Sequence, residues 1–297
     1  LMKLGKDIKE RIWKAVKKDR AKYEYDKNHA IALGINPSVY STINKYGFKD
    51  GILDDGILIS VARRLGVALR DETPWKIART PVFVYITEQL EMCQQSSLSG
   101  LFCDCCNIGK TFTAKAYINN HPNAIYVDCG QVKTKMRMIR YIARQFGLNG
   151  NGRYADVYDD LIYYLRGIEH PLIILDEAGD MSPETFLELK ALWNATDRTC
   201  GWYMMGANGL KAKIKRNLNS DTLGYEEMFS RYGDNFNRIT PEDERERVKF
   251  LKAQAAMVAK VNAPENANIN AIVNLSEGKL RRVYTEIEKI RREQNNA

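Results

Sequence analysis

Two short segments of this sequence carry side chains that together could bind the phosphates of a nucleotide. The first is D-C-C-N-I-G-K-T at residues 104–111, and the second is P-L-I-I-L-D-E at residues 171–177. In a P-loop, backbone amides at a helix N-terminus face the phosphates, a lysine neutralises their charge and a hydroxyl ligates magnesium. A carboxylate at a neighbouring strand end can hold the same metal ion. The two segments therefore predict a site for ATP and Mg²⁺.

Each polar side chain in these segments has an expected role. Lys110 is predicted to contact the outer phosphates, and Thr111 and Asp176 are predicted to hold magnesium. Glu177 is placed to polarise the water that attacks the γ-phosphate. The residues predicted to contact ATP are Asn107, Ile108, Gly109, Lys110, Thr111 and Phe112.

The first segment departs from the pattern G-x-x-x-x-G-K-[ST] at its first position, where Asp104 replaces glycine. An acidic side chain beside phosphates repels them unless it points away, so we expect Asp104 to weaken nucleotide affinity or hydrolysis if it faces the site. Asn107 is less disruptive, because asparagine tolerates positive φ. A chance G-K-T at a helix start is the alternative, and the second segment argues against it.

Alternating strands and helices must position these segments. Apolar runs at 101–105, 124–129, 172–175 and 202–205 predict four strands separated by helices, which is typical of an α/β fold with a parallel sheet covered on both faces. After Pro241 no strand pattern recurs. Three helical stretches, at roughly 241–260, 266–275 and 279–293, predict an all-α tail that forms a C-terminal helical lid.

The N-terminal part has helical periodicity without strands. Helices are expected at 7–22, 26–33, 36–46 and 52–65, with Gly34 as the turn of a helix-turn-helix motif. Val39 and Ile43 should then face the core. The residues left to reach DNA are Ser38, Ser41, Thr42 and Lys45. A helical bundle that contacts only protein is the alternative, but the basic face of the first helix, which includes Lys9, favours DNA.

These patterns divide the chain into four parts. We expect a small all-α helix-turn-helix domain at 1–70, a linker and leading helix at 71–95, an α/β nucleotide-binding domain at 96–240 and the helical lid at 241–297. The formal net charge of +8 allows a polyanionic partner. No apolar run approaches the roughly 20 residues that span a bilayer, and the first residues are charged, so we expect a cytoplasmic protein without a membrane partner.

Three of the six cysteines cluster at Cys103, Cys105 and Cys106. A zinc site would need a second pair of cysteine or histidine ligands at a defined spacing, which the sequence lacks. We therefore expect reduced, mostly buried thiols near a strand end.

With both segments in the right order, residues 96–297 resemble an AAA+ ATPase. The resemblance implies that Asn208 is the sensor-1 residue that positions the attacking water, and that Arg231 is an arginine finger acting on ATP held by a neighbouring subunit. It implies that Arg281, or alternatively Arg282, is the sensor-2 residue of the lid. Taken singly, an arginine in a basic helix is more often a solvated charge. A finger supplied by a neighbour implies homo-oligomers, as rings or filaments.

Two basic clusters follow strands of the AAA+-like part, where related ring-forming ATPases line a central channel. Lys133, Lys135, Arg137 and Arg140 follow the second strand, and Lys211, Lys213, Lys215 and Arg216 follow the fourth. They are expected to contact double-stranded DNA through its phosphates, although a solvated helix face is the alternative for each lysine.

A helix-turn-helix domain before a compact AAA+ module resembles phage Mu transposition protein B and related transposon target-selection ATPases. This resemblance implies an ATP-dependent assembly on DNA that marks target sites and stimulates a transposase partner. A replicative helicase loader or initiator is one alternative. Another is a DNA-binding regulator whose Asp104-containing loop binds nucleotide without hydrolysis.

Overall fold

The computed structural model describes residues 4–49, 51–69 and 75–295, which form two compact units divided after Pro74. The sequence analysis assigned residues 70–74 to the end of the first domain and to the linker, and these residues lie outside the described part of the chain. Each unit has its own hydrophobic core. None of the helices in the described ranges is long and apolar enough to cross a membrane.

The first unit is entirely helical. Its elements are α1 (Lys6–Asp19), η1 (Arg20–Lys22), α2 (Asp26–Leu33), α3 (Pro37–Tyr46) and α4 (Asp55–Leu65). Gly34 ends α2 with a φ of 74°, and Asn36 caps α3 by accepting a hydrogen bond from the Ser38 amide. The turn at Gly34 was predicted from the sequence. Ile43 is buried in the core of this unit, and Val39 packs against that core.

One feature of α1 differs from expectation. Lys9 was assigned to the exposed basic face, but its side chain is buried and its ammonium lies 2.8 Å from a carboxylate oxygen of Asp55 in α4. The prediction for Lys9 is therefore wrong. The helical period was correct, but only the packing of α4 against α1 brings this carboxylate to the lysine. Lys14 and Lys17 are exposed, as expected.

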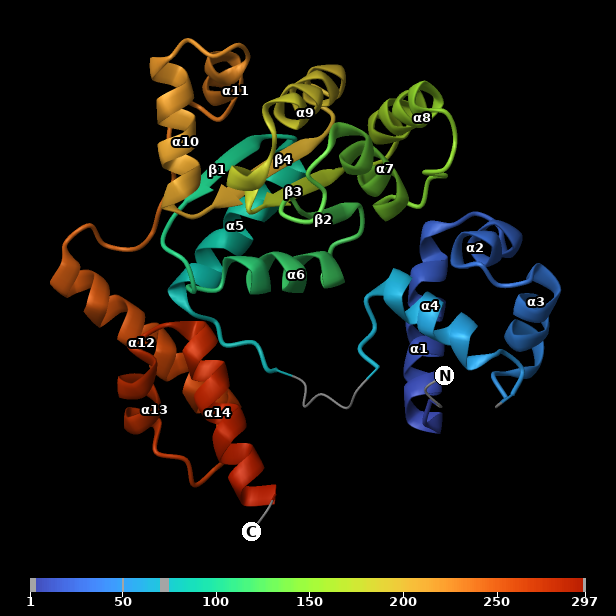
Figure 1. Ribbon diagram of the computed structural model, residues 1–297, viewed down its shortest axis with the longest axis horizontal. Coiled ribbons are helices and arrows are strands. Elements are labelled where there is room, and N and C mark those ends of the chain that lie inside the picture. Colours follow the sequence, from blue (N-terminus) through green and yellow to red (C-terminus); the bar gives the residue numbers. More distant parts are fainter. Residues whose placement is uncertain (1–3, 50, 70–74, 296–297) are drawn as a thin grey trace. The chain divides into compact units, whose positions relative to one another are not determined.

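The second unit is built on a four-stranded parallel sheet with the order β1-β4-β3-β2 (Figure 1). The strands are β1 (Ser99–Cys103), β2 (Ala124–Asp128), β3 (Leu172–Asp176) and β4 (Gly201–Gly206). The α/β fold with a parallel sheet is therefore confirmed. β1 ends two residues earlier than predicted, because the chain leaves the sheet at Asp104 to form the P-loop. Asn237 also pairs with β1 in parallel, as an isolated bridge to Phe102.

Helices cover both faces of this sheet. On one face lie α5 (Pro81–Ser96) and α6 (Lys110–Asn120). The other face is covered by α7 (Lys135–Gln145), α8 (Tyr154–Gly167), η2 (Ala178–Asp180), α9 (Pro183–Ala195), α10 (Asn208–Asn219) and α11 (Tyr225–Arg231). Successive strand residues alternate between the two cores, as in a sheet that is buried on both sides.

The lid comprises α12 (Glu244–Asn262), α13 (Ile269–Ser276) and α14 (Leu280–Asn295). These bounds agree closely with the three predicted helical stretches. Residues 75–80, predicted as linker, contribute to the lid instead. Trp75 packs against Tyr284 with ring centroids 5.2 Å apart, and Ala78 lies in the same apolar cluster as Ile272. The apolar side chains of this short segment explain why it packs against the lid helices instead of forming an extended linker.

Candidate nucleotide-binding site

The P-loop connects the end of β1 to the start of α6. Asn107 and Gly109 have φ values of 61° and 104°, in the left-handed region that asparagine tolerates and glycine favours. No side chain caps the N-terminus of α6. The first amides of this helix can therefore donate hydrogen bonds to an anion, as the first amides of a helix do in phosphate sites.

Lys110 and Thr111 begin α6 and face the site in different ways. Lys110 is 7% exposed, and its ammonium donates hydrogen bonds to the carbonyl oxygens of Asp104 (3.0 Å) and Cys105 (2.7 Å). The positive charge thus lies inside the curve of the loop. The Thr111 hydroxyl donates to Oδ2 of Asp176 at 2.5 Å. This bond joins the first predicted segment to the second.

Asp176 lies at the end of β3 and is 1% exposed. Its Oδ2 also accepts a hydrogen bond from the Tyr126 hydroxyl at 2.9 Å, and its Oδ1 accepts one from the Glu177 amide at 2.9 Å. The sequence analysis did not find Tyr126. It lies on β2 opposite Ile174 of β3, so its closeness to Asp176 depends on strand order, which was not predicted.

Glu177 follows Asp176 and has a φ of 49°, which is strained for a residue with a side chain. Desolvation raises the pKa of its carboxyl group, and the negative charge of Asp176 raises it further, while Lys110 lowers it. A carboxylate with a raised pKa is a stronger base than an ordinary glutamate. Because the side chain is exposed, it can reach a water molecule.

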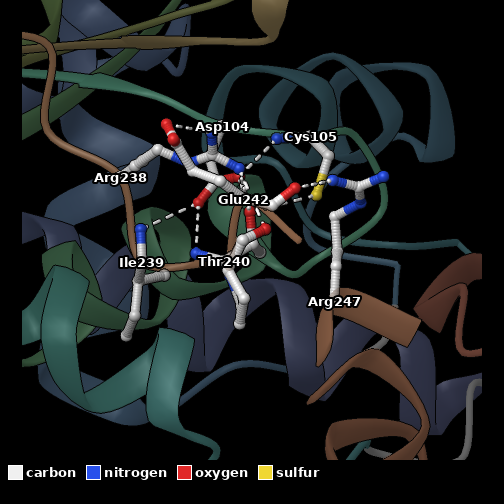
Figure 2. Close-up of polar contacts among 8 residues, drawn as sticks. Asp104, Cys105, Arg238, Ile239, Thr240, Glu242 and Arg247 are labelled. Atoms are coloured by element: carbon white, nitrogen blue, oxygen red, sulfur yellow. Dashed lines mark hydrogen bonds and ion pairs between the residues drawn. The ribbon is translucent and has the colours of Figure 1, made fainter. Parts of the chain in front are cut away.

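Asp104 does not face the P-loop interior. Its carboxylate is 1% exposed and points to Ile239 and Thr240, which lie in the segment before the lid (Figure 2). Burial alone would raise the pKa of Asp104. Hydrogen bonds from the Thr240 side chain, from the amides of Thr240 and Ile239, and from the Cys105 amide outweigh burial and hold the pKa below its ordinary value. The carboxylate is therefore ionised, and it lies against Ile239 and Thr240 rather than against the amides at the start of α6.

The remaining predicted contacts of the loop are of two kinds. Ile108 is 1% exposed and its side chain belongs to the core between the sheet, α5 and α6, so only its backbone can contact a ligand. Phe112 is 39% exposed in the first turn of α6.

The three clustered cysteines differ in exposure. Cys103 is buried, Cys105 is half-buried and Cys106 is exposed. The described residues contain no group of three or more cysteine, histidine, aspartate or glutamate side chains that could together hold a metal ion.

The other three predicted catalytic residues lie outside this cluster of hydrogen bonds. Asn208 is exposed at the first residue of α10, two residues after β4. Arg231 ends α11, where its guanidinium lies over the Trp193 ring (5.6 Å to the centroid) and 3.8 Å from a carboxylate oxygen of Asp197. Arg281 is exposed in the first turn of α14, next to Leu280, whose amide donates to the Asn107 carbonyl at 3.0 Å.

Comparison with known protein families finds a match in the central part of the chain. Residues 95–214 match the model of a family described as an AAA domain. This part of the chain is therefore similar to AAA domains. The match includes the P-loop, Asp176 and Asn208, and it ends within α10, so the first unit and the lid lie outside it.

Among solved structures, the chain is similar to NtrX from Brucella abortus in complex with ATP, with 16% sequence identity and a TM-score of 0.39. The similarity covers 84% of this chain and 63% of the NtrX chain. No curated protein matches this chain.

Proposed function

We propose that the AAA domain binds ATP with Mg²⁺ and hydrolyses it. The observation that carries this proposal is the 2.5 Å hydrogen bond between Thr111 and Asp176, which joins the start of α6 to the end of β3 beside Lys110. A hydroxyl and a carboxylate are the hard oxygen donors that Mg²⁺ prefers. The match to the AAA-domain family supports the same assignment.

Some residues of the site bind ATP and magnesium, and others take part in hydrolysis. The amides of the P-loop and of the first turn of α6 bind phosphate oxygens, and Lys110 neutralises their charge. Thr111 and Asp176 hold the magnesium ion, which when bound neutralises charge that develops on the phosphates. Glu177 accepts a proton from the attacking water, and Asn208 orients that water.

Two arginines are proposed to complete the site. Arg281 lies in the lid next to Leu280, whose amide donates to the Asn107 carbonyl of the P-loop, and we propose that its guanidinium senses bound nucleotide. Arg231 lies over Trp193 and near Asp197, and we propose that it acts on ATP in a neighbouring subunit. Hydrolysis would then depend on homo-oligomers, as rings or filaments.

A substitution at Tyr126 tests the proposed magnesium site by weakening it without removing a proposed ligand. Tyr126→Phe removes one of the hydroxyl groups that hold Oδ2 of Asp176 and keeps the ring in place. Because a hydrogen bond to a charged group contributes about 1.5–3 kcal/mol, we expect about tenfold to a hundredfold more Mg²⁺ to be needed for half-maximal phosphate release. Titration of Mg²⁺ at saturating ATP measures this. Tyr163→Phe is the control, since Tyr163 is 83% exposed. Equal Mg²⁺ dependence of all three proteins would contradict the role of Tyr126.

We propose that double-stranded DNA is the polyanionic partner. In the first unit, Ser38, Ser41, Thr42 and Lys45 are exposed on α3, the second helix of the predicted helix-turn-helix motif. In the second unit, Lys133, Lys135 and Arg137 are exposed where β2 leads into α7. Exposed basic and hydroxyl side chains of this kind contact phosphates.

Several basic side chains have partners within the chain. Lys213 donates to the carbonyl oxygens of Gly179 (2.8 Å) and Met181 (2.6 Å), and Lys211 lies 5.4 Å from the centre of the Phe236 ring. Arg140 donates to Gly150 and Gly152. We therefore expect Lys213 to hold the turn around η2 and Arg140 to hold the loop between α7 and α8. We keep Lys215 and Arg216, both exposed, as the basic residues of α10 that can reach DNA.

The combined variant Lys133→Ala/Lys135→Ala/Arg137→Ala tests the DNA contact. Each lost phosphate contact lowers the slope of log affinity against log salt concentration by about 0.9, so we expect a decrease of up to about 3 in that slope and weaker binding to every DNA sequence. Fluorescence anisotropy with a labelled duplex at several salt concentrations measures this. As a control for lost charge, Lys252→Ala/Lys260→Ala changes two exposed lysines of α12. An unchanged slope would remove these three residues from the interface.

The biological setting that we propose is transposition, in which assemblies on DNA select target sites and stimulate a transposase. It is supported by the order of parts, a small helical unit followed by an AAA domain and a helical lid. Purification of the protein with ATP and DNA from its own cells tests this assignment. Recovery of a transposase supports it, whereas recovery of a replicative helicase would favour a helicase loader.

A further inference from the structure

The first position of the P-loop carries a carboxylate that accepts four hydrogen bonds. Oδ1 of Asp104 accepts hydrogen bonds from the Cys105 amide (2.7 Å) and from the Thr240 hydroxyl, and Oδ2 accepts them from the amides of Ile239 (2.9 Å) and Thr240 (3.0 Å). Figure 2 shows these bonds converging on the carboxylate. Glycine, the usual residue at this position of the pattern, could make none of them.

The chemistry of the four partners requires a carboxylate. All four groups donate, two to each oxygen. An amide at this position would place its NH₂ group against the amides of Ile239 and Thr240 in one orientation, and against the Cys105 amide and the Thr240 hydroxyl in the other. Either orientation leaves at least one backbone amide without its acceptor. A buried donor without an acceptor destabilises the fold around it. Asp104→Asn therefore removes some of these hydrogen bonds with almost no change in side-chain size. The site is thus built for an ionised aspartate rather than merely tolerant of a polar residue.

The residues that Asp104 binds lead into the lid. Ile239 and Thr240 lie between α11 and α12, at the end of the α/β part of the unit. Arg238 extends the contact by donating to the Thr240 hydroxyl oxygen (3.2 Å) and to the Pro241 carbonyl (3.3 Å). Arg247, on α12 itself, donates to the Glu242 carbonyl at 3.0 Å. The hydrogen bonds therefore continue from the P-loop into the first turn of the lid.

A second contact joins the same loop to the far end of the lid. The amide of Leu280, the first residue of α14, donates to the Asn107 carbonyl at 3.0 Å. A Cβ atom on Gly109 would lie 3.4 Å from a methyl carbon of Leu280, so the helix packs closely on the loop. Within this unit, the P-loop is held at Asp104 by the entry to the lid and at Asn107 by the start of α14.

We propose that Asp104 is a positioning residue that fastens the P-loop to the segment Arg238–Thr240, so that the loop and the helical lid keep one orientation relative to each other. Asp104 does not touch nucleotide in this role. Its effect on ATP is indirect, through the shape of the loop and the place of Arg281 on α14. That second effect rests on the proposed ATP binding, whereas the fastening itself does not.

Hydrogen exchange of the full-length protein without nucleotide tests the fastening directly. The amides of Ile239 and Thr240 donate to Asp104, so in Asp104→Asn we expect their exchange to quicken by about tenfold or more. Asp234→Asn makes the same chemical change at an exposed residue of the preceding loop and should leave these amides unchanged. Unchanged exchange of Ile239 and Thr240 in Asp104→Asn would overturn the proposal.

Thr240→Val keeps the test decisive if Asp104→Asn does not fold. It removes one of the four donors and leaves both backbone amides in place, so we expect a smaller quickening, confined to residues 237–243 and the P-loop. Thr240→Ser keeps the hydroxyl and should restore slow exchange. Quickened exchange throughout the unit, or equal exchange in the valine and serine variants, would contradict a local fastening.

The affinity for a fluorescent ATP analogue separates this inference from the proposed function. We expect Asp104→Asn to raise the Kd by roughly tenfold and Thr240→Val by less, with no further increase when the two are combined, because both break the same contact. If the wild type binds no analogue, the proposed function fails, and the exchange experiment still decides the fastening. Additive increases in Kd would show that Asp104 and Thr240 act separately and would overturn the proposal.

Discussion

Glu177→Gln is expected to lower the rate of phosphate release from ATP by a factor of about 10² to 10⁴ and to leave ATP binding intact. The amide fills the same space and keeps the backbone of the turn, but it cannot accept a proton from water. Bound ATP would then persist, so complexes with DNA should also last longer. Phosphate release, ATP-analogue affinity and the dissociation rate from labelled DNA measure the three effects.

The matched control for this variant is Glu184→Gln, which removes an exposed carboxylate in the first turn of α9. It should hydrolyse ATP at the wild-type rate. Full hydrolysis by Glu177→Gln would remove this residue from the mechanism, and rapid dissociation of the variant from DNA would contradict the link between ATP retention and DNA binding.

The pH dependence provides an independent check on Glu177. Desolvation and the nearby Asp176 charge raise the pKa of Glu177, so its basic form is lost as the pH falls through a value above the ordinary 4.5. The wild-type rate should therefore decrease on the acidic side at a pH higher than a fully solvated glutamate, far from other charges, would give. Glu177→Gln should lack this decrease at pH values where the fold is intact.

Lys110→Ala should abolish measurable ATP binding. The ammonium is the only group of the P-loop that brings a full positive charge to the phosphates, and it also holds the carbonyl oxygens of Asp104 and Cys105. Equilibrium binding of a fluorescent ATP analogue measures the loss. Phosphate release should fall with it, both with and without DNA.

Two controls separate lost charge from lost structure in this variant. Lys115→Ala removes an exposed lysine of the same helix and should bind the analogue as the wild type does. Circular dichroism and gel filtration of Lys110→Ala should match the wild type, because the core around α6 does not depend on the ammonium. Tight binding of ATP by folded Lys110→Ala would contradict the assignment of the phosphate site.

The sequence was sufficient to predict the features that depend on local pattern. Glycine and asparagine at the P-loop tolerate positive φ, and an apolar run before Asp176 indicates a buried strand that ends in a carboxylate. The lid helices and the turn at Gly34 followed from periodicity and capping residues in the same way. In each case the residues that determine the structure lie within a few positions of one another.

The features that were missed depend on contacts between distant segments. Tyr126 approaches Asp176 only because β2 lies next to β3, and Asp104 faces away from the loop only because Ile239 and Thr240 supply donors 135 and 136 residues later. The ion pair of Lys9 with Asp55 has the same origin. Periodicity reports which face of a helix is apolar, but it does not report which charged residue another element brings to that face.

A structure of the protein with Mg²⁺, a slowly hydrolysed ATP analogue and duplex DNA tests the central claim most directly. We expect the triphosphate at the amides of residues 107–112, with Lys110 at its outer phosphates and the metal ion beside Thr111 and Asp176. Arg231 of an adjacent subunit should approach the same nucleotide. Nucleotide bound elsewhere on the chain, or a P-loop that excludes it while Lys110 keeps its bonds to Asp104 and Cys105, would contradict the claim.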